Sequence, residues 1–284
     1  MKPLYTMKLT MNFLAMSTLC SLIMFSSCGD EDDPVVSNDT ETTEDTTTED
    51  TTTEDTTTDD ALDFATLFYG AERVTIVGNF VEINTLDLPD HTSPFYPESD
   101  PLYAAYAGDN ADFSTVITAG GQTFDPEIAE QNYTLKIPIN PAAKSGSKSS
   151  TSGGAIGVAL NGVIIYNQYN GANELLDDLE FNNTDEYNGH PTPNTGGYHY
   201  HKEPLWLTSS DKSALVGYLL DGFPIYGPED ESGNTLATAD LDEYHGHTSA
   251  TAEYPDGIYH YHCTDDAPWI NGGEYYGTPG TVTQ

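Results

Sequence analysis

The residues in this sequence best suited to chemistry are its histidines. Eight are present, and seven of them fall in the stretch from 190 to 262. Four form two His-x-His pairs, His199 with His201 and His260 with His262, each inside the sequence Tyr-His-Tyr-His. Alternate residues of a β-strand share one face and lie about 6.5–7 Å apart along the chain. Each pair therefore predicts two imidazoles that point the same way, with the tyrosines packed in the core on the opposite face.

Two imidazoles on one strand supply part of a metal site, and a third ligand must come from another segment. His190 and His247 each follow a glycine that would let the chain turn tightly, and each could be the third ligand in its own half. His91 and His245 are less suited. Whether the two pairs share one ion or hold one each stays open at this level. The predicted metal ligands are His190, His199, His201, His247, His260 and His262.

These ligand types narrow the choice of metal. Imidazole suits zinc, copper, iron and nickel, whereas calcium and magnesium prefer oxygen. Cys263 is the single thiol nearby, which excludes a sulfur-rich site, so we expect copper or zinc. Metal-bound imidazoles usually donate their second ring N–H to an oxygen, and Asp185, Asp221 and Asp242 are the predicted acceptors. Cys263 itself is expected to be a buried apolar residue, with a metal ligand or an oxidation-sensitive thiol as alternatives.

An internal repeat surrounds these histidines. Three blocks recur in the same order, 57 to 61 residues apart. The matching blocks are 157–166 with 217–226, 185–190 with 242–247, and 198–201 with 259–262. The first block places Asn-Gly or Asp-Gly between two apolar runs, which predicts a β-hairpin with a type I′ turn. We interpret the pattern as a duplication of a hairpin plus a His-x-His strand, with units at about 157–201 and 217–262.

The paired Tyr-His-Tyr-His blocks, with Asp-Gly-Phe-Pro-Ile-Tyr-Gly at 221–227 between them, resemble the YHYH-domain family of exported bacterial proteins. The resemblance reaches back to Leu-Pro-Asp-His at 88–91 and covers most of residues 75–275. It implies export and hints at metal binding, without naming an activity. Members of the family often carry paired cysteines around these motifs. Here Tyr187 and Tyr244 stand at those places and Cys263 follows the second block alone, which leaves the role of Cys263 open.

The elements that must position the histidines are predominantly strands. Short runs rich in β-branched or aromatic residues, bounded by Gly, Pro and Asn, occur at 74–77, 133–137 and 156–160. Helical periodicity is poor, and only 125–131 and 173–181 could be short helices. A Gly/Ser-rich loop is expected at 144–154. The sequence therefore predicts one mainly β domain over residues 61–284.

The first 27 residues have the pattern of a lipoprotein signal peptide. Lys2 and Lys8 precede an apolar stretch at 13–25, which is too short to span a bilayer. Ser26 and Ser27 come directly before Cys28, as in a lipobox. We expect cleavage before Cys28 and a lipid on its thiol that anchors the protein to a membrane. Ordinary signal-peptidase cleavage is the alternative.

An acidic tether follows at 28–60. The formal net charge of the chain is −38, and residues 30–60 hold fourteen acidic residues and no basic one. Repeated Thr-Thr-Thr-Glu-Asp without apolar residues predicts disorder. The acidic run at 30–33 resembles a signal for the outer face of the outer membrane, and a periplasm-facing lipoprotein is the alternative. Nucleic acid is excluded as a partner, because phosphate contacts need clustered Lys and Arg.

Three functions remain open. The first is transition-metal binding by an anchored extracytoplasmic lipoprotein. The second is a metal-dependent hydrolase or oxidase, with Asp242 or Glu243 as base, although no residue demands a catalytic role. The third is a surface module for glycan or protein that uses Trp206, Trp269 and exposed tyrosines, with histidines that are structural and bonded to phenols.

Overall fold

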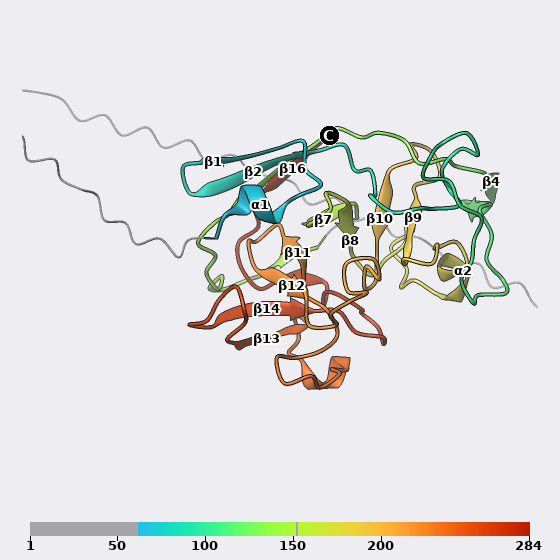
Figure 1. Cartoon of the computed structure of the whole chain (residues 1–284). Helices are drawn as coiled ribbons and strands as arrows, with labels where there is room; N and C mark the ends of the chain where they lie inside the picture. The colour runs from blue at the N-terminus through green and yellow to red at the C-terminus, as the bar shows by residue number, and fades with distance from the viewer. Residues whose placement is uncertain (1–61, 152) are drawn as a thin grey trace, which may run out of the picture. The chain divides into compact units, whose positions relative to one another are not determined.

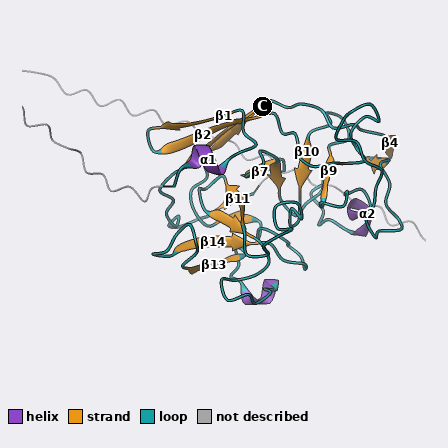
Figure 2. Ribbon diagram, in the orientation of Figure 1, coloured by secondary structure: helices purple, strands orange, loops and turns teal. Residues whose placement is uncertain are grey.

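The computed structural model describes residues 62–151 and 153–284. The predicted signal peptide, Cys28 and the tether at 28–60 lie outside the described residues. Strands predominate in the described ranges, and the helices are single turns: α1 (Phe64–Leu67), α2 (Asp178–Phe181) and the 3-10 turn Thr238–Asp240 (Figure 1, Figure 2). The predicted mainly β class is confirmed. No helix within these ranges combines the length and hydropathy needed to cross a membrane.

A four-stranded antiparallel sheet has the order β1-β2-β5-β16. Its strands are β1 (Arg73–Val77), β2 (Phe80–Thr85), β5 (Tyr133–Pro138) and β16 (Thr281–Thr283). Burial alternates along β2 and β5, so that Val81 and Ile83 face the core beside their cross-strand partners Ile137 and Leu135. This alternation is the period-two pattern that a sheet with one covered face requires. The strands predicted at 74–77 and 133–137 are both present.

An eight-stranded sheet holds the histidine motifs and has the order β13-β14-β12-β11-β7-β8-β10-β9 (Figure 1). Its strands in chain order are β7 (Ala155–Ala159), β8 (Ile164–Tyr166), β9 (Gly189–Pro191), β10 (Tyr198–Tyr200), β11 (Leu215–Leu219), β12 (Pro224–Tyr226), β13 (Gly246–Ser249) and β14 (Ile258–His262). Two short antiparallel pairs complete the domain: β3 (Ile117–Ala119) with β4 (Gln122–Phe124), and β6 (Ser149–Ser150) with β15 (Glu274–Tyr275).

The two halves of this sheet have one arrangement of strands. We call β7, β8, β10 and β9 the first half, and β11, β12, β14 and β13 the second half. In each half a hairpin's second strand pairs in parallel with the His-x-His strand, which pairs antiparallel with the strand of the third histidine. The halves meet where β7 pairs antiparallel with β11. This order matches the order of the repeated blocks, while a duplication as their origin stays a prediction.

The two hairpins form as expected, but their turns are not type I′. Only the glycines, Gly162 and Gly222, have positive φ, at 82° and 89°; Asn161 and Asp221 do not. Gly162 N–H donates to the Ala159 carbonyl at 2.9 Å, which closes a tight turn that ends on a left-handed glycine. The physical reason is that a turn of this kind needs positive φ at one residue, which glycine adopts without strain. The predicted turn type was therefore wrong.

Tyrosines make up much of the core on the face opposite the histidines. Tyr198, Tyr200, Tyr218 and Tyr261 are among the largest fully buried side chains. All five residues of β11 are buried, so the sheet is covered on both faces at its centre. A buried aromatic ring removes 150–250 Å² of surface from water, which makes these rings a main source of packing stability. The prediction that the motif tyrosines pack in the core is confirmed.

Two expectations about local structure require correction. Residues 125–131 form no helix, because their N–H groups bond to distant loops: Ile128 donates to Phe95 O and Ala129 to Gly196 O. In the stretch 173–181 only α2 is helical. The predicted loop at 144–154 contains the two-residue strand β6, which pairs with β15.

Candidate metal centres

The His-x-His strands each meet a third histidine in their own half. We call His190, His199 and His201 the first histidine group, and His247, His260 and His262 the second histidine group. One ring nitrogen from each member lies within 4.8 Å of the others in its group. The two groups lie toward opposite ends of the eight-stranded sheet. The two pairs therefore do not meet in one shared cluster, and each half has its own group of three histidines.

Strand register brings the third histidine into place. His190 on β9 lies directly opposite His199 on β10, and His247 on β13 lies directly opposite His260 on β14. Directly opposed residues of an antiparallel pair have Cβ atoms about 4.5–5.5 Å apart and side chains on the same face. The last member of each group follows two residues along the His-x-His strand. Three imidazoles per group therefore converge from two strands.

The glycine before each third histidine has a different role from the one expected. Positive φ occurs one residue earlier, at Asn188 (66°) and His245 (75°). A Cβ on Gly189 would lie 2.3 Å from Tyr198 Cζ, and one on Gly246 would lie 2.5 Å from the Tyr259 hydroxyl. Such contacts are closer than real side chains tolerate. The glycines are therefore needed for the close approach of the motif tyrosines, which fixes the two strands against each other.

The protonation of the first histidine group follows from its hydrogen bonds. The Nδ1–H of His199 donates to the Gly197 carbonyl at 3.1 Å, and that of His201 donates to the Asn167 carbonyl at 2.6 Å. A neutral imidazole has one N–H, so both Nε2 atoms carry lone pairs. These two Nε2 atoms lie 3.1 Å apart. Two acceptors at this distance repel each other unless a cation lies between them.

Burial also disfavours a second proton on either ring, which would give the pair a donor. Desolvation lowers the pKa of His199 well below its usual value and the pKa of His201 to about 4. Both rings are therefore neutral at pH 7. His190 adds a third unsatisfied ring: it is 2% exposed, and neither of its ring nitrogens has a hydrogen-bond partner among the described residues. Burial lowers its pKa to about 3.

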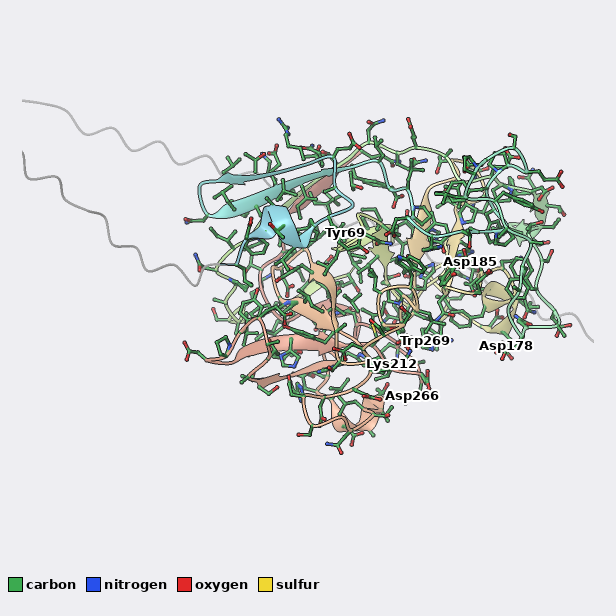
Figure 3. The ribbon with its side chains drawn as sticks, in the orientation of Figure 1. Tyr69, Asp178, Asp185, Lys212, Asp266 and Trp269 are labelled. Atoms are coloured by element: carbon green, nitrogen blue, oxygen red, sulfur yellow. The ribbon has the colours of Figure 1, made fainter. Side chains whose placement is uncertain are left out.

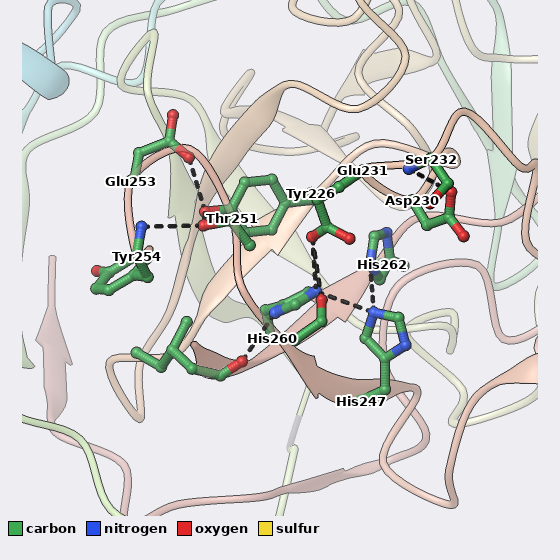
Figure 4. Close-up of polar contacts among 12 residues, drawn as sticks. Tyr226, Asp230, Glu231, Ser232, His247, Thr251, Glu253, Tyr254, His260 and His262 are labelled. Atoms are coloured by element: carbon green, nitrogen blue, oxygen red, sulfur yellow. Dashed lines mark hydrogen bonds and ion pairs between the residues drawn. The ribbon is translucent and has the colours of Figure 1, made fainter. Parts of the chain in front are cut away.

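The second histidine group has the same frame with one difference. His260 Nδ1–H donates to the Ile258 carbonyl at 3.0 Å, and His262 Nδ1–H donates to the Gly227 carbonyl at 2.7 Å. His247 Nε2 lies 3.0 Å from His260 Nε2 and 3.1 Å from His262 Nε2, as Figure 4 shows. His247 is half-buried, whereas His260 and His262 are buried. Here an Nε2–H on His247 could serve both neighbours, which gives this group a metal-free alternative.

The three aspartates have partners other than the predicted ones. Asp185 accepts from the Tyr198 hydroxyl at 2.8 Å, Asp242 from Tyr259 at 2.9 Å, and Asp221 from Tyr261 at 2.7 Å. These tyrosines point away from the histidines, so the carboxylates lie on the opposite face of the sheet (Asp185 is labelled in Figure 3). The histidine N–H groups donate to backbone carbonyls instead, because the strands already place those carbonyls within reach. The aspartates fix the tyrosines, and through them the strands.

His91 and His245 lie outside both groups. His91 Nε2 is 3.1 Å from the Tyr200 hydroxyl, and its Nδ1–H donates to the Thr92 carbonyl at 2.9 Å. His245 Nδ1–H donates to the His262 carbonyl at 2.9 Å. Both are buried and bonded to protein groups. Neither belongs to a histidine group.

Cys263 is fully buried and is a free thiol. Burial raises the pKa of this thiol well above its ordinary value, which makes a reactive thiolate unfavourable. The thiol is absent from both histidine groups. The expectation that Cys263 is a buried apolar residue is confirmed.

The other residues considered for function differ in exposure. Asp242 Oδ1 accepts from the Tyr259 hydroxyl and from the N–H groups of Tyr244 and Gly246, so the carboxylate considered as a base lies with the tyrosines and not with the histidines. Trp269 is 7% exposed and packs edge-on against Phe181 (Figure 3), so it offers no surface for a glycan.

Two glutamates that the sequence analysis did not select lie beside the histidine groups. Glu180 Oε1 is 3.7 Å from His190 Nε2, and Glu231 Oε1 is 3.8 Å from His260 Nε2. Burial, followed by the charge of Asp177, raises the pKa of Glu180. No spacing or motif marks these residues, because they come from a one-turn helix and a loop outside the repeated blocks.

A cavity of ≈ 690 Å³ lies over the first histidine group. Its lining includes all three histidines of the group together with Glu180 and Tyr166. The Tyr166 ring stacks on His199 with centroids 4.1 Å apart. A smaller cavity of ≈ 270 Å³ borders the second group at His262. Small molecules could therefore reach an ion held by the first group.

Fold and site together define a mainly β domain with two buried groups of three histidines, each compatible with a transition-metal site. The chain belongs to the YHYH protein family, whose model matches residues 134–235 and 229–273. The match begins at residue 134, so the segment 88–91, where the resemblance was expected to start, lies outside it. Comparisons with curated proteins and with solved structures gave no match.

Proposed function

We propose that each histidine group binds one transition-metal ion, copper or zinc, and that metal binding is the function of this domain. The observation that carries the proposal is the first histidine group. The Nε2 lone pairs of His199 and His201 face each other at 3.1 Å, with both Nδ1–H groups committed to carbonyls. A cation between them converts this repulsion into coordination.

The distances suit such an ion. Two nitrogen ligands at about 2.1 Å from one metal, with a tetrahedral angle between them, are about 3.4 Å apart. The Nε2 separations of 3.0–3.1 Å in the two groups need only a small adjustment to reach this value. Carbonyls that accept the Nδ1–H of a ligand fix its tautomer and its orientation. Both groups therefore offer preorganised nitrogen ligands.

The ligand set favours copper(II) and zinc over other ions. Neutral imidazoles bind both metals well, and the affinity order of divalent ions places copper(II) highest. Neither group contains a thiol or thioether that would favour copper(I). Metal supply at the protein's location then decides which of the two is bound.

Elemental analysis tests the proposal. The protein is purified without an affinity tag or chelator, and its zinc and copper contents are measured beside a variant that combines His199→Ala with His260→Ala. We expect about two equivalents of metal in the wild type and nearly none in the variant. A wild type that lacks metal and takes up neither Zn²⁺ nor Cu²⁺ on titration would remove the proposal.

We further propose that the domain is held outside the cytoplasm by a lipid on Cys28, at the outer membrane and facing the surface. The lipobox-like Ser-Ser-Cys at 26–28 and the acidic stretch after it support this location. Cells labelled with a fatty-acid analogue should label the wild type and not Cys28→Ser. External protease should remove the domain from intact cells; protection until the outer membrane is opened would place the domain on the periplasmic face.

The cavity favours a second candidate function, a metal-dependent hydrolase or oxidase centred on the first histidine group. A pocket of ≈ 690 Å³ is in the range that binds small molecules, and a metal ion there could activate water or oxidise a ligand. Azide titrated into the copper(II) form tests access. We expect a new charge-transfer band that persists in His260→Ala and is lost in His199→Ala. A band absent from the loaded wild type would contradict this candidate.

A further inference from the structure

We infer that Glu180 and Glu231 each supply a fourth, carboxylate ligand to the ion held by the neighbouring histidine group. This inference rests on the proposed metal binding and specifies the coordination of both centres: three imidazole nitrogens and one carboxylate oxygen. It adds two residues that belong to no sequence motif to the proposed sites.

The distances carry the first step. Ligand atoms bound to one ion at about 2.1 Å are about 3.0–3.6 Å apart for angles between 90° and 120°. Glu180 Oε1 lies 3.7 Å from His190 Nε2, and Glu231 Oε1 lies 3.8 Å from His260 Nε2. Both separations exceed a hydrogen bond and are close to the spacing of neighbouring ligands. The ligand atoms that lie within 4.8 Å of one another in each group are those of the histidines alone, so each glutamate side chain must move toward the ion to complete the shell.

Charge gives the second step. Three neutral imidazoles leave the full charge of a divalent ion uncompensated inside the protein, which is costly in a low-dielectric interior. The described residues that line the two cavities include no lysine or arginine, so neither carboxylate is already neutralised there. Glu180 and Glu231 are the carboxylates within 4 Å of a histidine of each group. One bound carboxylate halves the charge that must be buried.

The origin of the two glutamates gives the third step. Glu180 belongs to α2, and Glu231 belongs to the loop between β12 and β13. In the register of the hairpin blocks, position 231 corresponds to Gly171, so the loop glutamate has no counterpart in the first half. Two unrelated segments thus bring a carboxylate to the same place beside two similar histidine groups. A common need of both centres for an anionic ligand accounts for this better than inheritance with the repeat.

Both carboxylates are held in position by their surroundings. Asp177 caps α2 by accepting from the backbone N–H groups of Leu179 and Glu180, which orients the helix turn that carries Glu180. Ser249 Oγ donates to Glu231 Oε1 at 3.1 Å, on the side of β13 (Figure 4 shows Glu231 above His260). The glutamate side chains remain 29% and 40% exposed, so they can move toward an ion without breaking the core.

The experiment reads each centre separately in the full-length protein. His260→Ala removes the second centre so that the first can be studied alone, and His199→Ala does the reverse. In each background the adjacent glutamate is replaced by Gln, which keeps its shape and removes its charge. The matched controls are Glu174→Gln for the first centre and Ser213→Ala for the second, because both residues line the same cavities without an ion-pair contact to the histidines. Circular dichroism checks the fold.

Cobalt(II) titration supplies two readouts, affinity and coordination. We expect Glu180→Gln and Glu231→Gln to weaken binding at least about tenfold and to change the visible d–d spectrum, while the controls match their backgrounds. Glu180→Asp should recover part of the affinity. Unchanged affinity and spectrum in both Gln variants would overturn this inference and leave metal binding by the histidines intact. A wild type that binds no cobalt, zinc or copper would overturn the proposed function first.

Discussion

The two halves of the eight-stranded sheet share a frame and differ in what satisfies their histidines. In the first half, His199 and His201 present two lone pairs to each other, and His190 has no hydrogen-bond partner among the described residues. In the second half, His247 Nε2 lies within hydrogen-bond distance of both neighbours. An Nε2–H on His247 can therefore satisfy the second group, whereas the first group has no such proton to share. The same strand geometry thus leaves the two groups with different hydrogen-bonding options when no ion is bound.

The surroundings of the two histidine groups also differ, in burial and in nearby charge. The first group is fully buried and Tyr166 stacks on one of its rings. The second group has a half-buried member, and its cavity is bordered by the acidic side chains of Glu229, Glu231 and Glu253. Negative potential at a cleft raises the local concentration of cations and their rate of association. We expect the second centre to load and release metal faster than the first.

The faces that carry the tyrosines also match, with one change of charge. Tyr198 and Tyr259 bond to equivalent aspartates in the two halves. Tyr200 instead meets the neutral Asn161 at 3.2 Å, where Tyr261 meets the carboxylate of Asp221 at 2.7 Å. Burial raises the pKa of Asp221 to about 6. At this position the second half therefore carries a buried ionisable group where the first half has a neutral amide.

Removing a ligand should produce the largest effect. His199→Ala is expected to abolish metal at the first centre and to lower the total from about two equivalents to about one, because two imidazoles hold an ion far more weakly than three. His260→Ala should do the same at the second centre. Inductively coupled plasma mass spectrometry of dialysed protein measures both. The two single variants then show whether the centres act independently.

His91→Ala is the matched control, since His91 is as buried as the ligands but bonds to Tyr200 and Thr92. It should destabilise the fold and keep both metal equivalents. Equal metal loss in His91→Ala would mean that the ligand variants lose metal through unfolding.

Removing the metal should have the next largest effect on stability, and this effect should differ between the two halves of the sheet. An ion present at about 1,000 times its Kd contributes about 4 kcal/mol of stability. Without it, the first half keeps facing lone pairs, while a proton on His247 relieves the second half. Amide hydrogen exchange after chelation should therefore rise more in β9 and β10 than in β13 and β14. Equal or reversed deprotection would contradict the distinction between the groups.

The sequence was sufficient to predict which histidines come together because they belong to local patterns. Alternation in a strand placed His199 and His201 on one face, and the repeated Gly-His blocks identified His190 and His247 as partners. The presence of strands could also be predicted from the sequence, since β1, β5 and β7 are runs of β-branched and apolar residues. The pairing of the strands could not be predicted, because parallel contacts such as that of β8 with β10 join segments more than 30 residues apart.

The errors concern residues whose partners are distant in sequence. The aspartates were assigned to the histidines by chemical type, but strand pairing puts them beside tyrosines on the other face. Glu180 and Glu231 were missed because an ordinary surface-type residue gives no periodic signal. The segment 125–131 was considered as a possible short helix, although N–H groups in it are bound by remote loops. Tertiary hydrogen bonds decided each of these cases.

Removing tyrosine hydroxyls should also destabilise the two halves unequally, by a smaller amount than metal removal. Tyr261→Phe takes a donor from the buried carboxylate of Asp221, a bond to a charged group that contributes about 1.5–3 kcal/mol, and it also removes the acceptor of the Tyr276 N–H. Tyr200→Phe removes bonds to neutral partners, worth about 0.5–1.5 kcal/mol each. Urea denaturation of the metal-loaded protein at pH 7 should show the larger loss in Tyr261→Phe. A larger loss in Tyr200→Phe would show that the charge of Asp221 is not decisive.

The smallest effect concerns pH and again depends on Asp221. In the metal-free protein, His190 and His201 have pKa values lowered by burial to about 3 and about 4, so the unfolded state binds more protons below pH 6.5. Acidification from pH 6.5 toward 4 therefore lowers the free energy of unfolding. The pKa of Asp221 is raised to about 6, above its unfolded value of 3.8. The folded state binds its proton first, which opposes the loss as pH falls from 6 to 3.8.

Asp221→Asn should remove this opposition and supply the second half with the same residue type as Asn161 in the first. We expect the metal-free variant to lose on the order of 1 kcal/mol more than the wild type between pH 6 and pH 5. Urea midpoints of both proteins at the two pH values give the double difference, in which any effect of the substitution that does not depend on pH cancels. Parallel losses would mean that Asp221 stays ionised in the folded protein, held by the Tyr261 hydroxyl and the Gly277 N–H at 2.7 and 2.8 Å.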